Sequence, residues 1–175
     1  MEKLYNWFAA AIILVIIFGT MYGVVQQSQR NDANYPQIQI AEDTAASLNA
    51  GSKPSSLISG KVDINQSLAP FTIIYNHSGA VVAGSGYLNG TLPTVPIGVL
   101  TASKNKAYSF VTWQPQSGVR VAVVTVTANN FYVLSGRSLT EVEKNEQKTF
   151  KLSVIGGIAS IVVLSGAFLV DQRKR

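Results

Sequence analysis

The chain has 175 residues, a net charge of +5 and no cysteine, and only 13% of its residues are charged. The length predicts about one domain, the missing cysteines exclude disulfides and thiolate metal sites, and a single histidine argues against zinc. Three of the positive charges belong to Arg173, Lys174 and Arg175. Because no basic stripe interleaved with aromatic residues occurs in the interior, this charge predicts membrane topology and not nucleic-acid binding.

An apolar run at residues 7–25 lies close to the N-terminus, and residues 4–29 contain no charge. About 20 apolar residues are enough to cross a bilayer as a helix. The alternative is a cleaved signal peptide, but the run exceeds the usual apolar core and no Ala-x-Ala-like site precedes the polar region. We therefore expect residues 1–30 to form a transmembrane helix, with Trp7 and Tyr22 near its two interfaces.

Residues 31–50 are expected to form a second helix, with Pro36 in its first turn, where a missing N–H costs nothing. Asn49, Ala50 and Gly51 together are a stop signal. Four apolar residues recur at the spacing of one helical stripe: Ile38, Ala41, Ala45 and Leu48. The stripe predicts a helix that packs on the domain. The alternative is a signalling helix that transmits motion from the domain to the first span.

The following residues, 52–137, are rich in β-branched runs separated by turn residues. A hairpin is predicted first, with strands at 71–75 and 80–83 around the polar turn Asn76-His77-Ser78-Gly79. A short helix or loop over 95–104 then crosses to a three-stranded meander, with strands at 108–113, 119–127 and 131–135. The predicted fold class is α+β: a five-stranded antiparallel sheet with flanking helices, bracketed by two transmembrane helices.

Three segments carry a resemblance. PFTIIYNHSGAVVAGSGYLNG resembles the central hairpin of extracytoplasmic PAS-like or Cache-type sensor domains. TWQPQSGVRVAVV and YVLSGRSLTEVEKNE resemble the last strands and the exit helix of such domains in bacterial membrane sensor histidine kinases. The resemblance covers residues 36–147 and implies a domain that binds a small molecule or senses the envelope. Asn76 replaces the family's turn aspartate, and we expect the chain to lack a cytoplasmic output module.

One arginine and four aromatic residues are candidate ligand contacts: Arg120, Trp113, Tyr75, Tyr87 and Phe110. Arg120 lies in an otherwise apolar strand, and its planar guanidinium suits a carboxylate ligand; the alternative is an outward-facing strand residue. The aromatic side chains are expected in the core or at the rim of a ligand cavity.

No Ser-His-Asp set, carboxylate pair, phosphate loop or metal motif is visible, so we expect neither an enzyme nor a cofactor. His77 is expected to be a solvated turn residue, with a pH switch or ligand contact as the alternative. Arg137 is expected to have a structural role, pairing with Glu141 or with the incoming loop.

Residues 138–141, Ser-Leu-Thr-Glu, match a capping box, in which the Ser138 hydroxyl accepts from the Glu141 N–H and the Glu141 carboxylate reaches back. The helix that begins there is expected to continue into the apolar run at 152–170, so that residues 150–175 form a second transmembrane helix and a basic tail. By the positive-inside rule the tail is cytoplasmic. We therefore expect a two-pass protein of the cell membrane, with both termini cytoplasmic and residues 31–149 forming an extracytoplasmic domain.

Four small residues of the second span form two small-xxx-small pairs: Ser153 with Gly157, and Gly156 with Ser160. Such pairs let another helix approach closely. That helix is the first span, a second copy of the chain or another membrane protein; the alternative is that these are ordinary small residues in a span.

Two functions fit this sequence. The first is a membrane-anchored sensory or ligand-binding protein that signals through a membrane partner. The second is a structural or accessory subunit of a membrane complex that uses its domain for protein–protein contact. A domain whose centre is filled with hydrophobic side chains would argue against the first.

Overall fold

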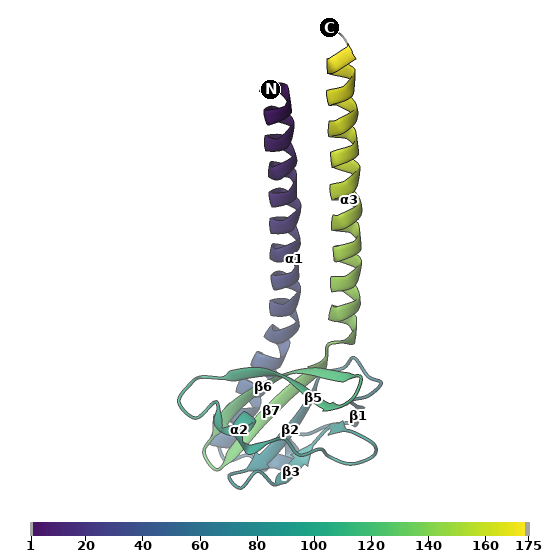
Figure 1. Ribbon diagram of the computed structural model, residues 1–175. Coiled ribbons are helices and arrows are strands. Elements are labelled where there is room, and N and C mark those ends of the chain that lie inside the picture. The colour runs from purple at the N-terminus through teal and green to yellow at the C-terminus, as the bar shows by residue number, and fades with distance from the viewer. Residues whose placement is uncertain (1, 174–175) are drawn as a thin grey trace. The chain divides into compact units, whose positions relative to one another are not determined.

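The computed structural model describes residues 2–173, which form two compact units (Figure 1). One unit combines the residues up to Arg30 with those from Glu143 onwards, and the other is Asn31–Val142. Two helices, α1 (Glu2–Asn49) and α3 (Thr140–Arg173), are long and apolar enough to cross a membrane. We call the first unit the helix pair and the second the sheet domain.

The sheet domain contains a five-stranded antiparallel sheet with the strand order β3-β2-β7-β6-β5 (Figure 1). Its strands are β2 (Phe71–Asn76), β3 (Val81–Gly84), β5 (Ser109–Gln116), β6 (Val119–Ala128) and β7 (Phe131–Ser138). The hairpin β2–β3 is followed by a crossover containing α2 (Ile97–Thr101) and by the meander β5–β6–β7. The predicted α+β class and the predicted order of hairpin, crossover and meander are confirmed.

Three short elements complete the domain: the 3-10 helix η1 (Pro54–Ser56) and the parallel pair of β1 (Val62–Asp63) with β4 (Gly86–Tyr87). The hairpin closes onto the end of the meander, because β2 pairs with β7 along its whole length, from Phe71 opposite Gly136 to Asn76 opposite Phe131. This pairing joins segments far apart in the chain and makes β7 the central strand of the sheet.

Both faces of the sheet are covered, since residues 121–126 of β6 are all buried although alternate side chains point to opposite faces. On one face, which we call the α2 face, Tyr75, Val123 and Leu134 pack with Leu100 of α2. On the other, the α1 face, a cluster combines α1 with three strands: Ala41, Ala45, Leu48, Ile74, Val124, Val126, Ala128 and Val133, with Ile38 partly buried against it. The predicted helical stripe is therefore confirmed.

Side-chain capping explains the tight turn between β2 and β3. The Asn76 carboxamide oxygen accepts hydrogen bonds from the N–H of Ser78, the hydroxyl of Ser78 and the N–H of Ala80. Gly79 adopts a φ of 82°, which residues with a Cβ rarely adopt. The Asn76 side chain thus closes the turn through three hydrogen bonds.

Three local predictions are wrong. Pro36 does not begin a helix but lies inside the continuous α1, because a proline removes only one helical hydrogen bond while the stripe that follows is held against the sheet. β5 does not end at Trp113 but continues through Pro115, which an edge strand tolerates.

The third wrong prediction is the capping box at the start of α3. β7 extends to Ser138 and α3 begins at Thr140, so the Ser138 hydroxyl accepts from the Thr140 N–H at 3.3 Å and not from Glu141. The Glu141 carboxylate lies 3.8 Å from Nη2 of Arg137 instead. The Arg137 Nε also donates to the Leu68 carbonyl at 3.0 Å, so both predicted contacts of Arg137 form.

Candidate functional site

Four of the five residues proposed as ligand contacts lie in the five-stranded sheet and point to both of its faces, and Tyr87 lies outside this sheet. Trp113 is opposite Val121 and packs on the α2-face cluster, which also contains Tyr75. Phe110 is opposite Val124, which places it on the α1 face, where it stacks on Tyr108 at 5.8 Å. Because residues opposite each other on paired strands share a face, Phe110 and Trp113 cannot contact one small ligand together.

The other two candidates lie apart from these. Arg120 is exposed on β6, and its carbonyl accepts from the N–H of Leu139 at 2.9 Å. It follows the buried Val119 of the α2-face cluster, so its side chain points to the α1 face. Tyr87 is half-buried in β4, with Nζ of Lys61 5.3 Å from its ring centroid. The structure therefore does not bring the five residues together.

Tyr75 is fully buried, and its role is structural. Its hydroxyl donates to the Pro93 carbonyl at 2.9 Å, which ties the crossover to β2. Burial raises the pKa of Tyr75 above its usual value, since the phenolate would lose its hydration. The side chain therefore remains neutral and serves as a hydrogen-bond donor.

Phe71 is only 2% exposed and belongs to the buried cluster of the α2 face. A Cβ on Gly86 would lie 2.3 Å from Cδ2 of this ring, and a Cβ on Gly136 would lie 2.6 Å from its Cζ. The ring therefore occupies the space that side chains at these two positions would otherwise take. The sequence alone does not show this contact, since it joins three separate strands.

Gln37 was not singled out from the sequence. It is fully buried, and neither its Oε1 nor its Nε2 has a hydrogen-bond partner among the described residues. Gln37 lies one helical turn before Ala41, so the spacing of the stripe on α1 was a signal that could have found it. An unsatisfied buried amide costs about 1–3 kcal/mol, which marks this position as an exception within a well-paired domain.

His77 joins two turns of the sheet domain. Its Nε2 lies 2.8 Å from the Asn129 carbonyl, and its ring meets Tyr132 edge-on at 5.3 Å between centroids. The residue is exposed, as expected for a turn. Its contacts link the β2–β3 turn to the β6–β7 turn, which supports a structural role.

In the helix pair, the four small residues of α3 are all partly buried. Gly156 and Gly157 lie against Phe18 of α1, and a Cβ on Gly156 would be 2.9 Å from Cε1 of that ring. The Ser160 hydroxyl donates to the Gly156 carbonyl at 2.8 Å within α3. Of the three partners considered for these residues, the structure thus places the first span beside them.

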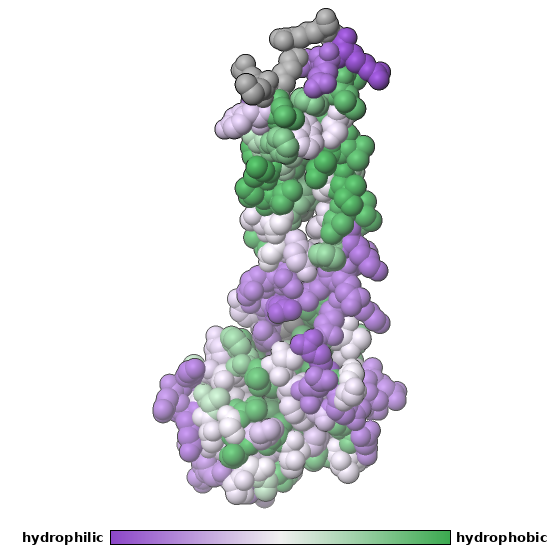
Figure 2. Space-filling view, viewed as in Figure 1, coloured by the Kyte–Doolittle hydropathy of each residue, from purple (hydrophilic) through white to green (hydrophobic). Residues whose placement is uncertain are grey.

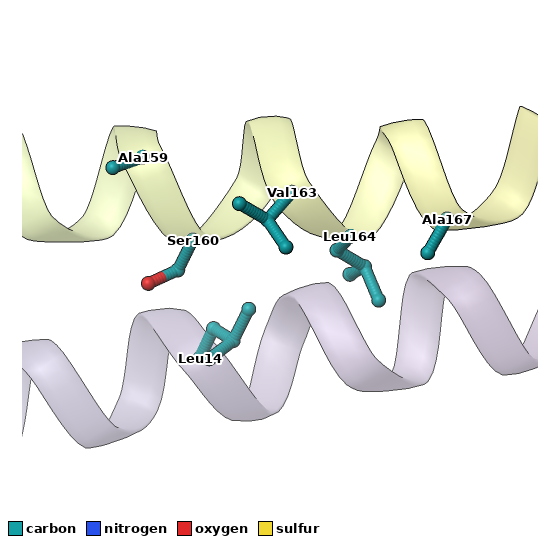
Figure 3. A pocket seen from close by; sticks show the side chains of 6 residues that line it. All are labelled: Leu14, Ala159, Ser160, Val163, Leu164 and Ala167. Atoms are coloured by element: carbon teal, nitrogen blue, oxygen red, sulfur yellow. The ribbon is translucent and has the colours of Figure 1, made fainter.

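An apolar groove of about 500 Å³ follows these residues along the helix pair (Figure 3). Leu14 of α1 faces five residues of α3 across it: Ala159, Ser160, Val163, Leu164 and Ala167. Apolar side chains also cover the outside of the same segments, as Figure 2 shows. Such a surface suits lipid chains or another helix, because Ser160 is its single polar side chain and the Ser160 hydroxyl already donates to the Gly156 carbonyl.

An ion pair joins the two helices outside their apolar segments. Nε of Arg30 lies 2.6 Å from Oε1 of Glu146, and its Nη2 donates to Oε2 at 3.3 Å. Hydrogen bonding and attraction to this carboxylate raise the pKa of Arg30, so the guanidinium stays charged. The Glu146 carboxylate thus accepts two hydrogen bonds from one guanidinium, a geometry more specific than a single contact.

Among residues 2–173, no group of three histidine, aspartate or glutamate side chains is arranged to hold a metal ion. No family model, no curated protein and no solved structure matches this chain.

Proposed function

We propose that the chain is a two-pass membrane protein with both termini in the cytoplasm and the sheet domain outside. Two helices that are long and apolar enough to span support this proposal. The basic tail that begins with Arg173 supports the orientation, because basic residues next to a span remain on the cytoplasmic side. Two crossings then return the chain to the side from which it started.

Within this topology, the sheet domain is an accessory module that contacts other proteins. The observation that carries this proposal is the filled α2 face, where Phe71 is in close contact with Gly86 and Gly136. A small-molecule receptor needs a cavity of several hundred Å³ that encloses its ligand. The predicted ligand residues also lie on opposite faces, so a receptor function has less support than a contact function.

A PAS or Cache type is proposed for the domain on the order of its elements. A hairpin, a crossover with a short helix, a meander and an exit helix follow each other as in the resembled sensor domains. This is an analogy of fold, and a fold hosts many functions, so the type does not decide between sensor and accessory module.

The sensor function is the second candidate, and the continuity of both long helices favours it. α1 and α3 each belong partly to the helix pair and partly to the sheet domain, with no linker between the two parts. A rigid helix can transmit a displacement of the domain to a membrane segment.

The two candidates differ in a ligand screen of the full chain in detergent micelles. Trp7→Phe leaves Trp113 as the single tryptophan, so that fluorescence reports thermal unfolding of the sheet domain. When the ligand concentration is 100 times the dissociation constant, binding stabilises a receptor by about 2.7 kcal/mol. The accessory function predicts no shift with organic acids, amino acids or other small metabolites. A shift that disappears in Arg120→Ala but persists in Lys106→Ala would overturn it and favour the sensor.

A further inference from the structure

β5 forms an open edge of the sheet. The strand order places it last, after β6, so one side of its backbone has no neighbouring strand among residues 2–173. It is eight residues long and carries no charge. Phe110 and Val111 are 56% and 43% exposed, one on each face of the strand. Unpaired N–H and C=O groups beside exposed apolar side chains are a template for another strand.

The opposite edge of the sheet differs in length, in regularity and in cover. β3 has only four residues, and its ladder with β2 is irregular between Ile74 and Tyr75. The 3-10 helix η1 also packs against it. Short length, irregular pairing and a covering segment are devices that prevent edge-to-edge association. β5 has a comparable irregularity only after Trp113, so the five residues 109–113 form a regular and unprotected edge.

We propose that β5 pairs with β5 of a second copy of this chain, antiparallel and about a two-fold axis at Val111, so that the two sheets become one. A two-fold axis perpendicular to the sheet places residues that point to the same face opposite each other. The axis must therefore pass between two copies of the same residue, and not between neighbouring residues. Val111 is the middle of the regular stretch, and centring the axis there pairs all five of its residues.

The sequence of β5 suits pairing with itself. Centred on Val111, Phe110 lies opposite Thr112 of the second copy, an aromatic side chain beside a β-branched one. Ser109 lies opposite Trp113, and Val111 lies opposite Val111. No charged side chain meets a like charge, whereas a strand containing lysine would repel its own copy. This inference goes beyond the proposed function and stands without it, because it rests on the geometry of β5.

Cysteine cross-linking of the full chain in detergent micelles tests the proposal, because the native chain has no cysteine. Val111→Cys places two thiols opposite each other on the axis, at a separation that a disulfide can bridge. Val82→Cys is the matched control, since Val82 is 46% exposed and lies on the other edge. Mild oxidation should give roughly ten-fold more covalent dimer for Val111→Cys than for Val82→Cys.

A second pair of variants keeps the result independent of disulfide chemistry. Val111→Lys places like charges on the axis and should convert the chain to a monomer in light scattering, while Val82→Lys should leave it dimeric. Equal cross-linking at both edges, a native chain that is monomeric, or a Val111→Lys variant that remains dimeric would each overturn the proposal. A strand of a different protein bound at β5 would also do so, since Val111→Cys would then not form a homodimer.

Discussion

Gly86→Ala tests the tight packing of the sheet domain. The added Cβ would lie 2.3 Å from Cδ2 and 2.6 Å from Cγ of Phe71. Carbon atoms in contact prefer about 3.5–4.0 Å, so the ring or the strand must move by more than about 1 Å. Cγ is the root of the ring and cannot swing away, and the ring is also in contact with Gly136.

Overpacking of this kind costs about 1–3 kcal/mol, and we expect Gly86→Ala near the upper limit. For a domain of this size, 1 kcal/mol lowers the melting temperature by about 4 °C or more, so a decrease of roughly 12 °C is expected. The assay is thermal unfolding of the full chain in micelles, followed by Trp113 fluorescence in the Trp7→Phe background.

Two controls identify the cause of the loss. Gly98→Ala in α2 has nothing within 4 Å of the new Cβ and should be neutral or slightly stabilising. Combining Gly86→Ala with Phe71→Leu should cost less than the sum of the two single changes, by about 1 kcal/mol or more, because the smaller side chain makes room. A Gly86→Ala chain as stable as the native one would refute the reasoning and would leave space for a ligand.

Three further variants test other contacts. Gly156→Leu should separate α1 from α3 and broaden the distance distribution between spin labels at Ile17 and Ile158. Gly166→Leu should not, because a Cβ at Gly166 would have no atom within 4 Å. Tyr75→Phe should cost about 1 kcal/mol through the lost bond to Pro93. Because burial raises the pKa of Tyr75, the native domain loses stability as the pH rises above about 10, where the unfolded tyrosine ionises, and Tyr75→Phe should lose less. Gln37→Leu should raise stability by about 1 kcal/mol in thermal unfolding, and a loss would show that the amide has a bound partner.

The sequence was most informative where one segment determines its own structure. The period of the α1 stripe, the polar turn after Tyr75 and the β-branched run of β6 each identified an element, because local spacing sets which side chains face the core. The continuity of α3 followed from a run of residues without a helix breaker.

Contacts between distant segments could not be predicted in the same way. The positions of Gly86 and Gly136 in the sequence do not predict that both contact Phe71, since these contacts depend on how β4, β2 and β7 are arranged. The aromatic residues and Arg120 were grouped by type, but the alternation of strands sends Phe110 and Arg120 to one face and Trp113 and Tyr75 to the other. Pro36 was misplaced because tertiary packing overrode its tendency to begin a helix.

The two-pass topology with an external sheet domain is the central claim, and cysteine accessibility tests it most directly. Ser117→Cys lies in the exposed turn between β5 and β6, and Gln172→Cys lies near the end of α3. In intact bacterial spheroplasts, a membrane-impermeant maleimide should label Ser117→Cys at once and Gln172→Cys only after permeabilisation. Labelling of both variants in intact spheroplasts, or of Gln172→Cys alone, would contradict the account.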